Sequence, residues 1–416
     1  MLSPQFRLFW VGEAVSLVGT ATTGVLLPLV AATQLDAGPV AMGLLTASSW
    51  LPWLVLGLPA GALVDQLPPR ATMIVADVVA ATAAGTVPLL AALDHLTVPA
   101  LVVVAFVIGC CSVAFRGALP RLITRVVEPD DLATANSRLY GTESASQIVG
   151  PGLAGGLAAV VTAAGAVILD ALSFVVSALC LAQLRPRAGT EDGREPFLRR
   201  IRVGLLVVGG DPILRYFPFL ALAANFGLTG LAALQVLFLV DEVGASEATI
   251  GVLLAIVGLG GVLGAGVAPL VARRLGSARG DMYLQFASCS VLLVPLATGG
   301  MGLGWMVVGL LVAETAIVAS NVIRTTWRQR YVAQDLLGRV STINQTIAFA
   351  AMPVAALVAG WLGQAIGVRS AIALMLCVHV AGVLTMPFSP VGRVRDLPDP
   401  AAAPAGRDPR FAAWRT

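Results

Sequence analysis

Six ionisable side chains interrupt long apolar stretches of this chain, and they are the residues best placed to bind protons or a polar substrate group. They are Glu13, Asp77, Arg138, Glu143, Asp170 and Glu314. A charged side chain at the middle of a membrane helix costs roughly 2.5–3.5 kcal/mol on insertion scales, so a residue kept there usually has a function. Glu314 lies close to the middle of its apolar stretch, where a carboxyl group removed from water is suited to proton uptake and release at physiological pH.

Structural roles compete with the functional ones for several of these residues. Glu13 and Arg138 are expected near the same end of neighbouring helices, where they could form a salt bridge. Asp77 and Asp170 fall on peripheral helices, which favours structural hydrogen bonds. Glu143 could face a central cavity or the opposite half of the protein. The set that we expect at a proton-coupling site or a substrate cavity is Glu13, Glu314, Glu143 and Arg138.

The composition places these stretches in a membrane. Of the 416 residues, 57% are hydrophobic and only 12% are charged, whereas a soluble domain has about 25% charged residues. The mean hydropathy is +0.89. A helix needs roughly 20 mostly apolar residues to cross the hydrocarbon core. Twelve stretches of that kind lie near 7–31, 40–64, 71–93, 99–118, 134–160, 163–184, 216–240, 248–272, 282–299, 303–324, 341–365 and 370–389.

The arginines predict the orientation of these helices. All 26 basic residues are arginines, and basic residues gather on the cytoplasmic side of membrane proteins. With both termini in the cytoplasm of a bacterium, every arginine except Arg138 and Arg369 falls at a cytoplasmic helix end or loop. The net charge of +3 then reflects orientation in the plasma membrane, not nucleic-acid binding. A chain without lysine also lacks the phosphate-binding loop of a self-contained ATPase.

The chain divides into two similar halves. We expect a six-helix bundle at 1–184, a cytoplasmic linker at 185–215, a second six-helix bundle at 216–390 and a disordered cytoplasmic tail at 391–416. Shifted by 203 residues, "GALVDQLPPR" from Gly61 overlays "GAGVAPLVAR" from Gly264 with five identities, and a shift of 204 brings Asp131 onto Asp335. Repeated sets of membrane helices are typical of secondary transporters, whose binding sites lie near the bilayer midplane.

The first of these loops resembles a known family. "GALVDQLPPR" is similar to the loop between spans two and three of the major facilitator superfamily. The resemblance implies an all-α fold of twelve transmembrane helices in two pseudo-symmetric bundles, and a cytoplasmic latch between the halves formed by Asp65 and Arg70. This chain departs from the pattern at Gln66 and at Pro68 and Pro69. The residues assigned to this gate motif are Gly61, Asp65, Arg70 and Asp77.

Other segments resemble the drug/proton antiporters of that superfamily. "GTESASQIVGPGLAGG" in the fifth span is similar to their glycine- and proline-rich motif, through Gly150, Pro151, Gly155 and Gly156. "DLLGRVSTINQ" and "FRLFWVGEAVSLVGT" resemble the branch that contains macrolide efflux pumps and the enterobactin exporter. Thr20 stands where that branch often has an acid. The residues assigned to the second-half loops are Arg273, Asp335, Gly338 and Arg339.

Together the residues and the resemblance predict an exporter of a hydrophobic or amphipathic small molecule, such as a drug, an antibiotic or a siderophore-like compound. It would work by alternating access and proton antiport, as a monomer in the lipid bilayer. We expect no catalytic residue, no cofactor and no metal, so it would not be an enzyme. The alternative is a symporter or facilitator that imports a small metabolite, which the Gly-Pro motif of the fifth span disfavours.

Overall fold

The structure is a computed structural model that describes residues 3–56, 67–128, 131–187 and 197–398. Every regular element in these ranges is helical, so the all-α prediction is confirmed. Nine helices in the described ranges are long and apolar enough to cross a membrane. The shorter apolar helix α2 (Pro39–Val55) is followed by residues outside the described ranges.

The helices form two groups in chain order. The first group contains α1 (Pro4–Gln34), α2, α4 (Pro69–Ala92), α5 (Val98–Val126), α6 (Leu132–Val160), α7 (Ala163–Ala166) and α8 (Ile168–Gln183). The second contains α9 (Phe197–Gly210), α10 (Pro212–Leu237) with the π-helical turn Phe238–Glu242, α11 (Glu247–Leu275), α12 (Ser277–Ser288) with the 3₁₀ segment Cys289–Leu296, α13 (Leu303–Tyr331), α14 (Gln334–Ile366) and α15 (Val368–Leu384).

Local signals in the sequence start these helices. Ser3 caps α1 by accepting a hydrogen bond from the Phe6 amide at 3.1 Å, and Asp211 caps α10 by accepting from the amides of Ile213 and Leu214. A proline occupies the first position of α1, α2, α4 and α10, where its missing N–H costs no hydrogen bond. Caps and prolines therefore determine where these helices begin, which the apolar runs alone do not define.

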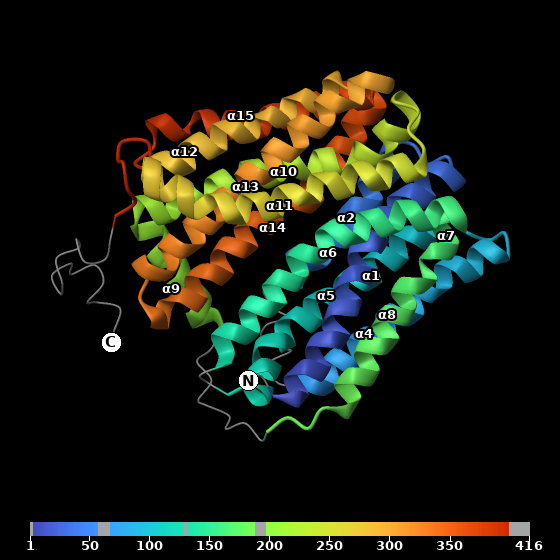
Figure 1. The fold of residues 1–416 in the computed structure, drawn as a ribbon, viewed down its shortest axis with the longest axis horizontal. Helices are drawn as coiled ribbons and strands as arrows, with labels where there is room; N and C mark the ends of the chain where they lie inside the picture. Colours follow the sequence, from blue (N-terminus) through green and yellow to red (C-terminus); the bar gives the residue numbers. More distant parts are fainter. Residues whose placement is uncertain (1–2, 57–66, 129–130, 188–196, 399–416) are drawn as a thin grey trace.

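Two pairs of helices carry most of the contact between the groups. α2 packs on α14, and α6 packs on α11. Figure 1 shows the two groups converging at one end and diverging toward the side where both chain termini lie. We call the helix ends near the termini the termini end and the opposite ends the distal end. The pathway between the groups is therefore framed by α2, α6, α11 and α14.

The C-terminal segment 391–398 packs against the second group, so the predicted disorder is wrong for these eight residues. The Ala278 and Arg279 amides donate to the Arg395 carbonyl, both at 3.1 Å, and the Trp327 indole donates to the Pro398 carbonyl at 2.9 Å. Leu397 is buried. The prediction failed because the apolar Val391 and Leu397 are only two residues in a Pro/Ala-rich sequence, yet both enter the core beside Trp327.

Candidate functional site

Two glycine contacts join the helix groups near the distal end. A Cβ atom on Gly43 of α2 would lie 2.9 Å from the Cα of Gly360 on α14, and one on Gly155 of α6 would lie 2.5 Å from the Cα of Gly251 on α11. No side chain larger than hydrogen fits at that separation, so the backbones touch directly. The two contacts occupy equivalent places in the two halves, and they close the interface at this end.

The glycine motif of α6 is divided between two neighbours. A Cβ on Gly150 would lie 2.5 Å from the Cβ of Ala21 on α1, inside the first group. The carbonyl of Pro151 lies against Gly251 of α11, beside Gly155. Gly156 has open space around it, so it makes no close contact with a neighbouring helix in the described residues. The residues of this motif therefore face three different surroundings of α6, namely α1, α11 and open space.

Aromatic side chains from both groups meet nearer the middle of the interface. Phe349 of α14 lies between Trp50 and Trp53 of α2, with ring centroids 5.6 Å and 5.4 Å apart. At a rise of about 1.5 Å per residue, Trp50 is about 10 Å closer to the termini end than Gly43. These rings cover the α2–α14 side of the pathway at mid-depth.

Glu13 and Asp77 are both buried in the first group, with exposed fractions of 8% and 2%. Glu13 lies within electrostatic range of Asp77, Arg116 and Glu143. The Ser177 hydroxyl of α8 lies near the Asp77 carboxyl. Glu13 Oε2 and Asp77 Oδ2 have no hydrogen-bond partner in the described part of the chain. The first group thus holds two buried acids with unsatisfied oxygens close to each other.

Glu143 and Arg138 make different contacts from those expected. Arg116 of α5 pairs with Glu143 of α6 at 2.6 Å, and both side chains are part-exposed. Arg138 lies 5.7 Å from the ring centroid of Trp10 instead of reaching Glu13, so the expected Glu13–Arg138 pair is not formed. The importance of Arg116 was missed because the apolar run ends near residue 118, whereas α5 continues to Val126 and places Arg116 about 15 Å inside the helix.

Asp170 and Glu314 occupy the first and second group respectively. Asp170 accepts a hydrogen bond from Ser173 at 3.1 Å and lies against Gly19 of α1, which fits the expected structural role. Glu314 lies on α13, where its Cβ would be 2.9 Å from a Cβ on Gly260 of α11. Within the described ranges its carboxylate has no hydrogen bond or ion pair, and the side chain is partly buried. Glu314 is therefore available to a proton or a ligand.

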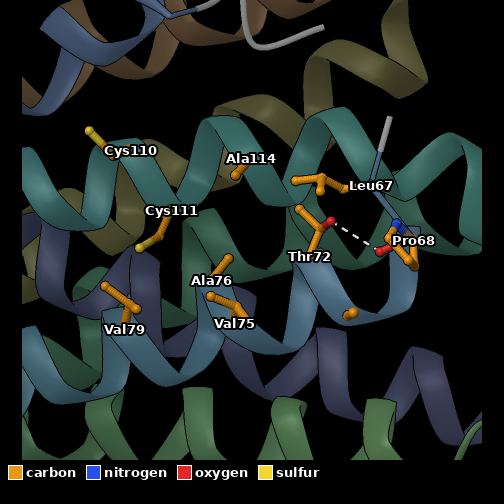
Figure 2. A pocket seen from close by; sticks show the side chains of 10 residues that line it. Leu67, Pro68, Thr72, Val75, Ala76, Val79, Cys110, Cys111 and Ala114 are labelled. Atoms are coloured by element: carbon orange, nitrogen blue, oxygen red, sulfur yellow. Dashed lines mark hydrogen bonds between the residues drawn. The ribbon is translucent and has the colours of Figure 1, made fainter. Parts of the chain in front are cut away.

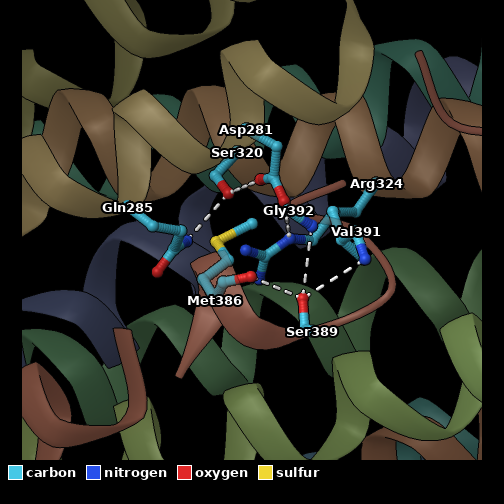
Figure 3. A network of polar contacts seen from close by, with 8 residues as sticks. All are labelled: Asp281, Gln285, Ser320, Arg324, Met386, Ser389, Val391 and Gly392. Carbon is cyan, nitrogen blue, oxygen red and sulfur yellow. Dashed lines mark hydrogen bonds and ion pairs between the residues drawn. The ribbon is translucent and has the colours of Figure 1, made fainter. Parts of the chain in front are cut away.

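The second group contains a buried polar network that sequence analysis missed. Asp281 of α12 accepts from Arg324 at 3.0 Å and from the Ser320 hydroxyl, which in turn accepts from Gln285 at 2.8 Å (Figure 3). Asp281 is fully buried. It was missed because the apolar stretch begins at residue 282. The repeat carried the signal, since Asp281 stands 204 residues after Asp77.

An apolar groove of about 360 Å³ lies between α4 and α5, outside the interface (Figure 2). Val79, Ala76 and Cys111 line it, and Cys111 is within electrostatic range of Asp77. The five cysteines of the chain are free thiols. The groove supplies no cation that could pair with Asp77.

Comparison with known proteins identifies the family. The sequence profile of the Major Facilitator Superfamily matches residues 9–356. The chain belongs to this superfamily. It is 30% identical to the multidrug efflux pump Tap of Mycolicibacterium fortuitum over 382 residues, which cover 88% of this chain and 89% of Tap. It is 23% identical to macrolide efflux protein A of Streptococcus pyogenes over 372 residues, covering 88% and 91% of the two chains.

A solved superfamily structure shares the fold in two states. A bacterial homologue of the iron transporter ferroportin superposes with a TM-score of 0.69 in its inward-facing state, at 17% identity, with 93% of this chain and 98% of that chain covered. Its outward-facing state gives 0.60, at 16% identity and the same coverage. As a member of this superfamily, the protein is a multi-pass membrane transporter and not an enzyme.

The superfamily gate motif falls partly outside the described residues. Gly61 and Asp65 lie there, so the latch stays a prediction. The Arg70 guanidinium donates to the carbonyls of Leu181, at 2.9 Å, and Ala182. These carbonyls lie in the last turn of α8, where the Leu181 carbonyl also accepts from the Leu184 amide at 3.2 Å. Arg70 therefore fastens α4 to α8 in this arrangement. Asp77, assigned to the same motif, lies deeper and contacts Ser177 instead.

The second-half loop residues are spread over two helices. Arg273 is exposed near the end of α11. Gly338 accepts a hydrogen bond from Thr342 at 2.9 Å and has open space around it. The Arg339 carbonyl would lie 3.0 Å from a Cβ on Gly204, so α9 packs on α14 at this point. The side chain of Asp335 lies outside the described residues. The role of this set stays a prediction.

Proposed function

We propose that the protein exports a hydrophobic or amphipathic small molecule from the bacterial cytoplasm by proton antiport. In this proposal twelve helices cross the plasma membrane as two six-helix bundles, 1–184 and 216–390, joined by a cytoplasmic linker at 185–215. The termini end is cytoplasmic, and the protein works as a monomer. The similarity to Tap and to macrolide efflux protein A favours export of a drug-like compound.

The observation that carries the proposal is the closure of one end of the interface by the Gly43–Gly360 and Gly155–Gly251 contacts. Backbones packed this closely leave no route for a substrate at the distal end, while the helix groups diverge toward the termini (Figure 1). The higher TM-score with an inward-facing relative than with its outward-facing state supports the same reading. We infer that the arrangement opens to the cytoplasm.

Alternating access then requires these contacts to separate. Each bundle moves as a unit, the glycine backbones part at the distal end, and the cytoplasmic ends close, where Asp65 and Arg70 would latch the halves. The rings of Trp50, Trp53 and Phe349 come from opposite bundles. They would therefore separate in the same movement, exposing flat apolar faces to a substrate at mid-depth.

Buried carboxyl groups supply the coupling to protons. Glu314 has no charged partner among the described residues, so a proton on its carboxylate removes a charge from the pathway. One proton crossing 100 mV provides roughly 2.3 kcal/mol. That free energy supports about a fiftyfold substrate gradient when one proton is exchanged for one molecule.

Growth inhibition tests the direction and the coupling residue together. Cells expressing the wild type should tolerate at least one compound in a panel of macrolides, tetracyclines and cationic dyes, and Glu314→Gln should abolish that tolerance. Glu247→Gln is a matched control, because Glu247 lies at the distal start of α11 and accepts from Thr33 at the surface. Sensitisation by the wild type would instead favour an importer, the alternative function.

A further inference from the structure

Three helices of the first bundle converge at Ser177. A Cβ on Gly12 of α1 would lie 3.3 Å from the Cα of Ser177, so α8 approaches α1 directly beside Glu13. From α4, the Asp77 carboxyl lies near the Ser177 hydroxyl. Glu13, Asp77 and Ser177 are all buried. At about 1.5 Å per residue, both acids lie about 12–14 Å from the termini end of their helices. The two acids therefore lie at one depth, within electrostatic range of each other.

The surroundings do not neutralise two negative charges there. Arg116 is the cation within range of Glu13, and it already pairs with Glu143 at 2.6 Å. Cys111 of α5 adds no positive charge. α8 contributes the Ser177 hydroxyl to the Asp77 carboxyl, and one oxygen of each acid has no partner in the described residues. Two carboxylates held close together in a desolvated site do not both ionise.

In the second bundle, an arginine neutralises the buried aspartate at the equivalent position. At the 204-residue offset, Asp77 corresponds to Asp281, which is paired with Arg324 at 3.0 Å. The position equivalent to Arg324 in the first bundle is Pro120. The first bundle thus has a buried aspartate at the same place without the arginine, and with Glu13 beside it.

We propose that Glu13 and Asp77 form one proton-binding site, in which the two carboxyl groups share a single proton in this arrangement. The inference rests on the proposed proton antiport. It assigns Asp77 to proton coupling instead of to the cytoplasmic gate motif. When Arg116 exchanges Glu143 for Glu13, the carboxyl O–H bond breaks and the proton passes to water. Both acids are then ionised, and Arg116 supplies the counter-charge. Asp77 affects proton release from Glu13 because the two carboxyl groups share the proton.

Infrared difference spectroscopy of the purified full-length protein in lipid nanodiscs tests this site without a substrate. As the pH is raised, protonated carboxyl bands should disappear in two separate steps that belong to the pair. Glu13→Gln or Asp77→Asn should leave one of these two steps, and the double variant should lack both of them. Asp170→Asn is the matched control, because Asp170 is a buried acid of the same bundle held by Ser173. It should leave both steps unchanged.

Two results would overturn the shared site. One is a wild type in which both acids stay ionised across the titration. The other is a pair of independent steps, so that removing one acid leaves the midpoint of the other unmoved. Circular dichroism and size-exclusion profiles matching the wild type establish that each variant is folded. Because no substrate is involved, failure here leaves the export proposal standing, and failure of export in vesicles leaves the titration result standing.

Discussion

The two bundles hold the buried aspartates at one repeat position, Asp77 and Asp281, in opposite ways. In the second bundle, Asp281 is satisfied by Arg324 and Ser320, and the network continues through Gln285 into the core. In the first bundle, Asp77 has a serine partner and an unsatisfied oxygen. An ion pair stabilises a buried acid in its charged form, whereas a buried acid without a cation is costly when ionised. The comparison teaches that one position of the repeat holds an acid with an arginine in one bundle and without one in the other.

The C-terminal segment adds bonds at the termini end of the second bundle. The C-terminal segment fastens the second bundle, where the Ser277 amide donates to the Asp396 carboxylate at 2.9 Å and the Leu397 amide donates to Ser277 at 2.8 Å. Gly276 turns there with a φ of 90°, which glycine adopts without strain. These bonds tie the C-terminal segment to the start of α12.

Removing Arg324 should have the largest effect, because it leaves Asp281 buried and charged without a partner. We expect Arg324→Leu to lower the free energy of unfolding by about 3–5 kcal/mol. Thermal unfolding of the purified protein measures this loss. The matched variant Asp77→Asn removes an acid that has no arginine, and it should leave the melting temperature within error. Equal losses in both variants would contradict the comparison.

Enlarging the distal glycine contact should have the next largest effect. In Gly155→Ala the new methyl would meet the Gly251 backbone, and overpacking of this kind costs about 1–3 kcal/mol. The cost falls on the arrangement in which the distal end is closed, so the balance between the two states shifts about 5- to 150-fold. Export rates in vesicles and distal-side accessibility to a thiol reagent measure the shift. Gly156→Ala, one residue along, should behave as wild type, and an equal defect there would refute the assignment.

Loss of the C-terminal fastening should have a moderate effect. Asp396→Ala removes a side-chain cap from the start of α12 and should lower the free energy of unfolding by about 1 kcal/mol. Deleting 391–416 should cost more than this single change, because Leu397 and the carbonyl bond of Trp327 are lost as well. Deleting only 399–416 is the control and should cost nothing measurable in a chemical denaturation series.

The exposed ion pair of the first bundle should have the smallest effect. Arg187 holds the pKa of Glu128 below its ordinary value through a hydrogen bond and its charge. Because the pKa of Glu128 is lower in the folded state, the ion pair stabilises the fold when the pH is above the ordinary pKa of a glutamate. That stabilisation is lost as the pH falls through the lowered pKa. Because both side chains are solvated, Glu128→Gln should leave the melting temperature at neutral pH unchanged. A loss of stability as large as that of Arg324→Leu would show that burial does not distinguish the Arg187–Glu128 pair from the Arg324–Asp281 pair.

The sequence predicts the helices well, because a run of about twenty apolar residues has few alternatives to a membrane helix. The predicted span 303–324 corresponds to α13, which continues to Tyr331 beyond the apolar run. A criterion based on apolar length misses polar residues near the ends of the helices. Asp281 lies one residue before its apolar stretch and Arg116 lies two residues from the end of its own, and both form ion pairs.

The candidate site was predicted only in part. Residue type identified Glu13, Asp77 and Glu314, because an acid in an apolar run is visible in one sequence. Partners were not visible, since contacts such as Arg116–Glu143 join helices whose facing depends on tertiary packing. The glycine-rich segment is visible in the sequence, but which glycine meets which helix depends on rotation about the helix axis, as Gly155 and Gly156 demonstrate.

Transport into inverted membrane vesicles tests the central claim most directly, namely that protons carried by the first bundle drive export. A radiolabelled compound to which the wild type confers tolerance, with a macrolide as the first choice, is added outside vesicles whose interior is acidic. We predict uptake by the wild type that stops when the pH gradient is dissipated, is lost in Asp77→Asn and persists in Asp170→Asn. Uptake that ignores the gradient, or that survives in Asp77→Asn, would contradict the account.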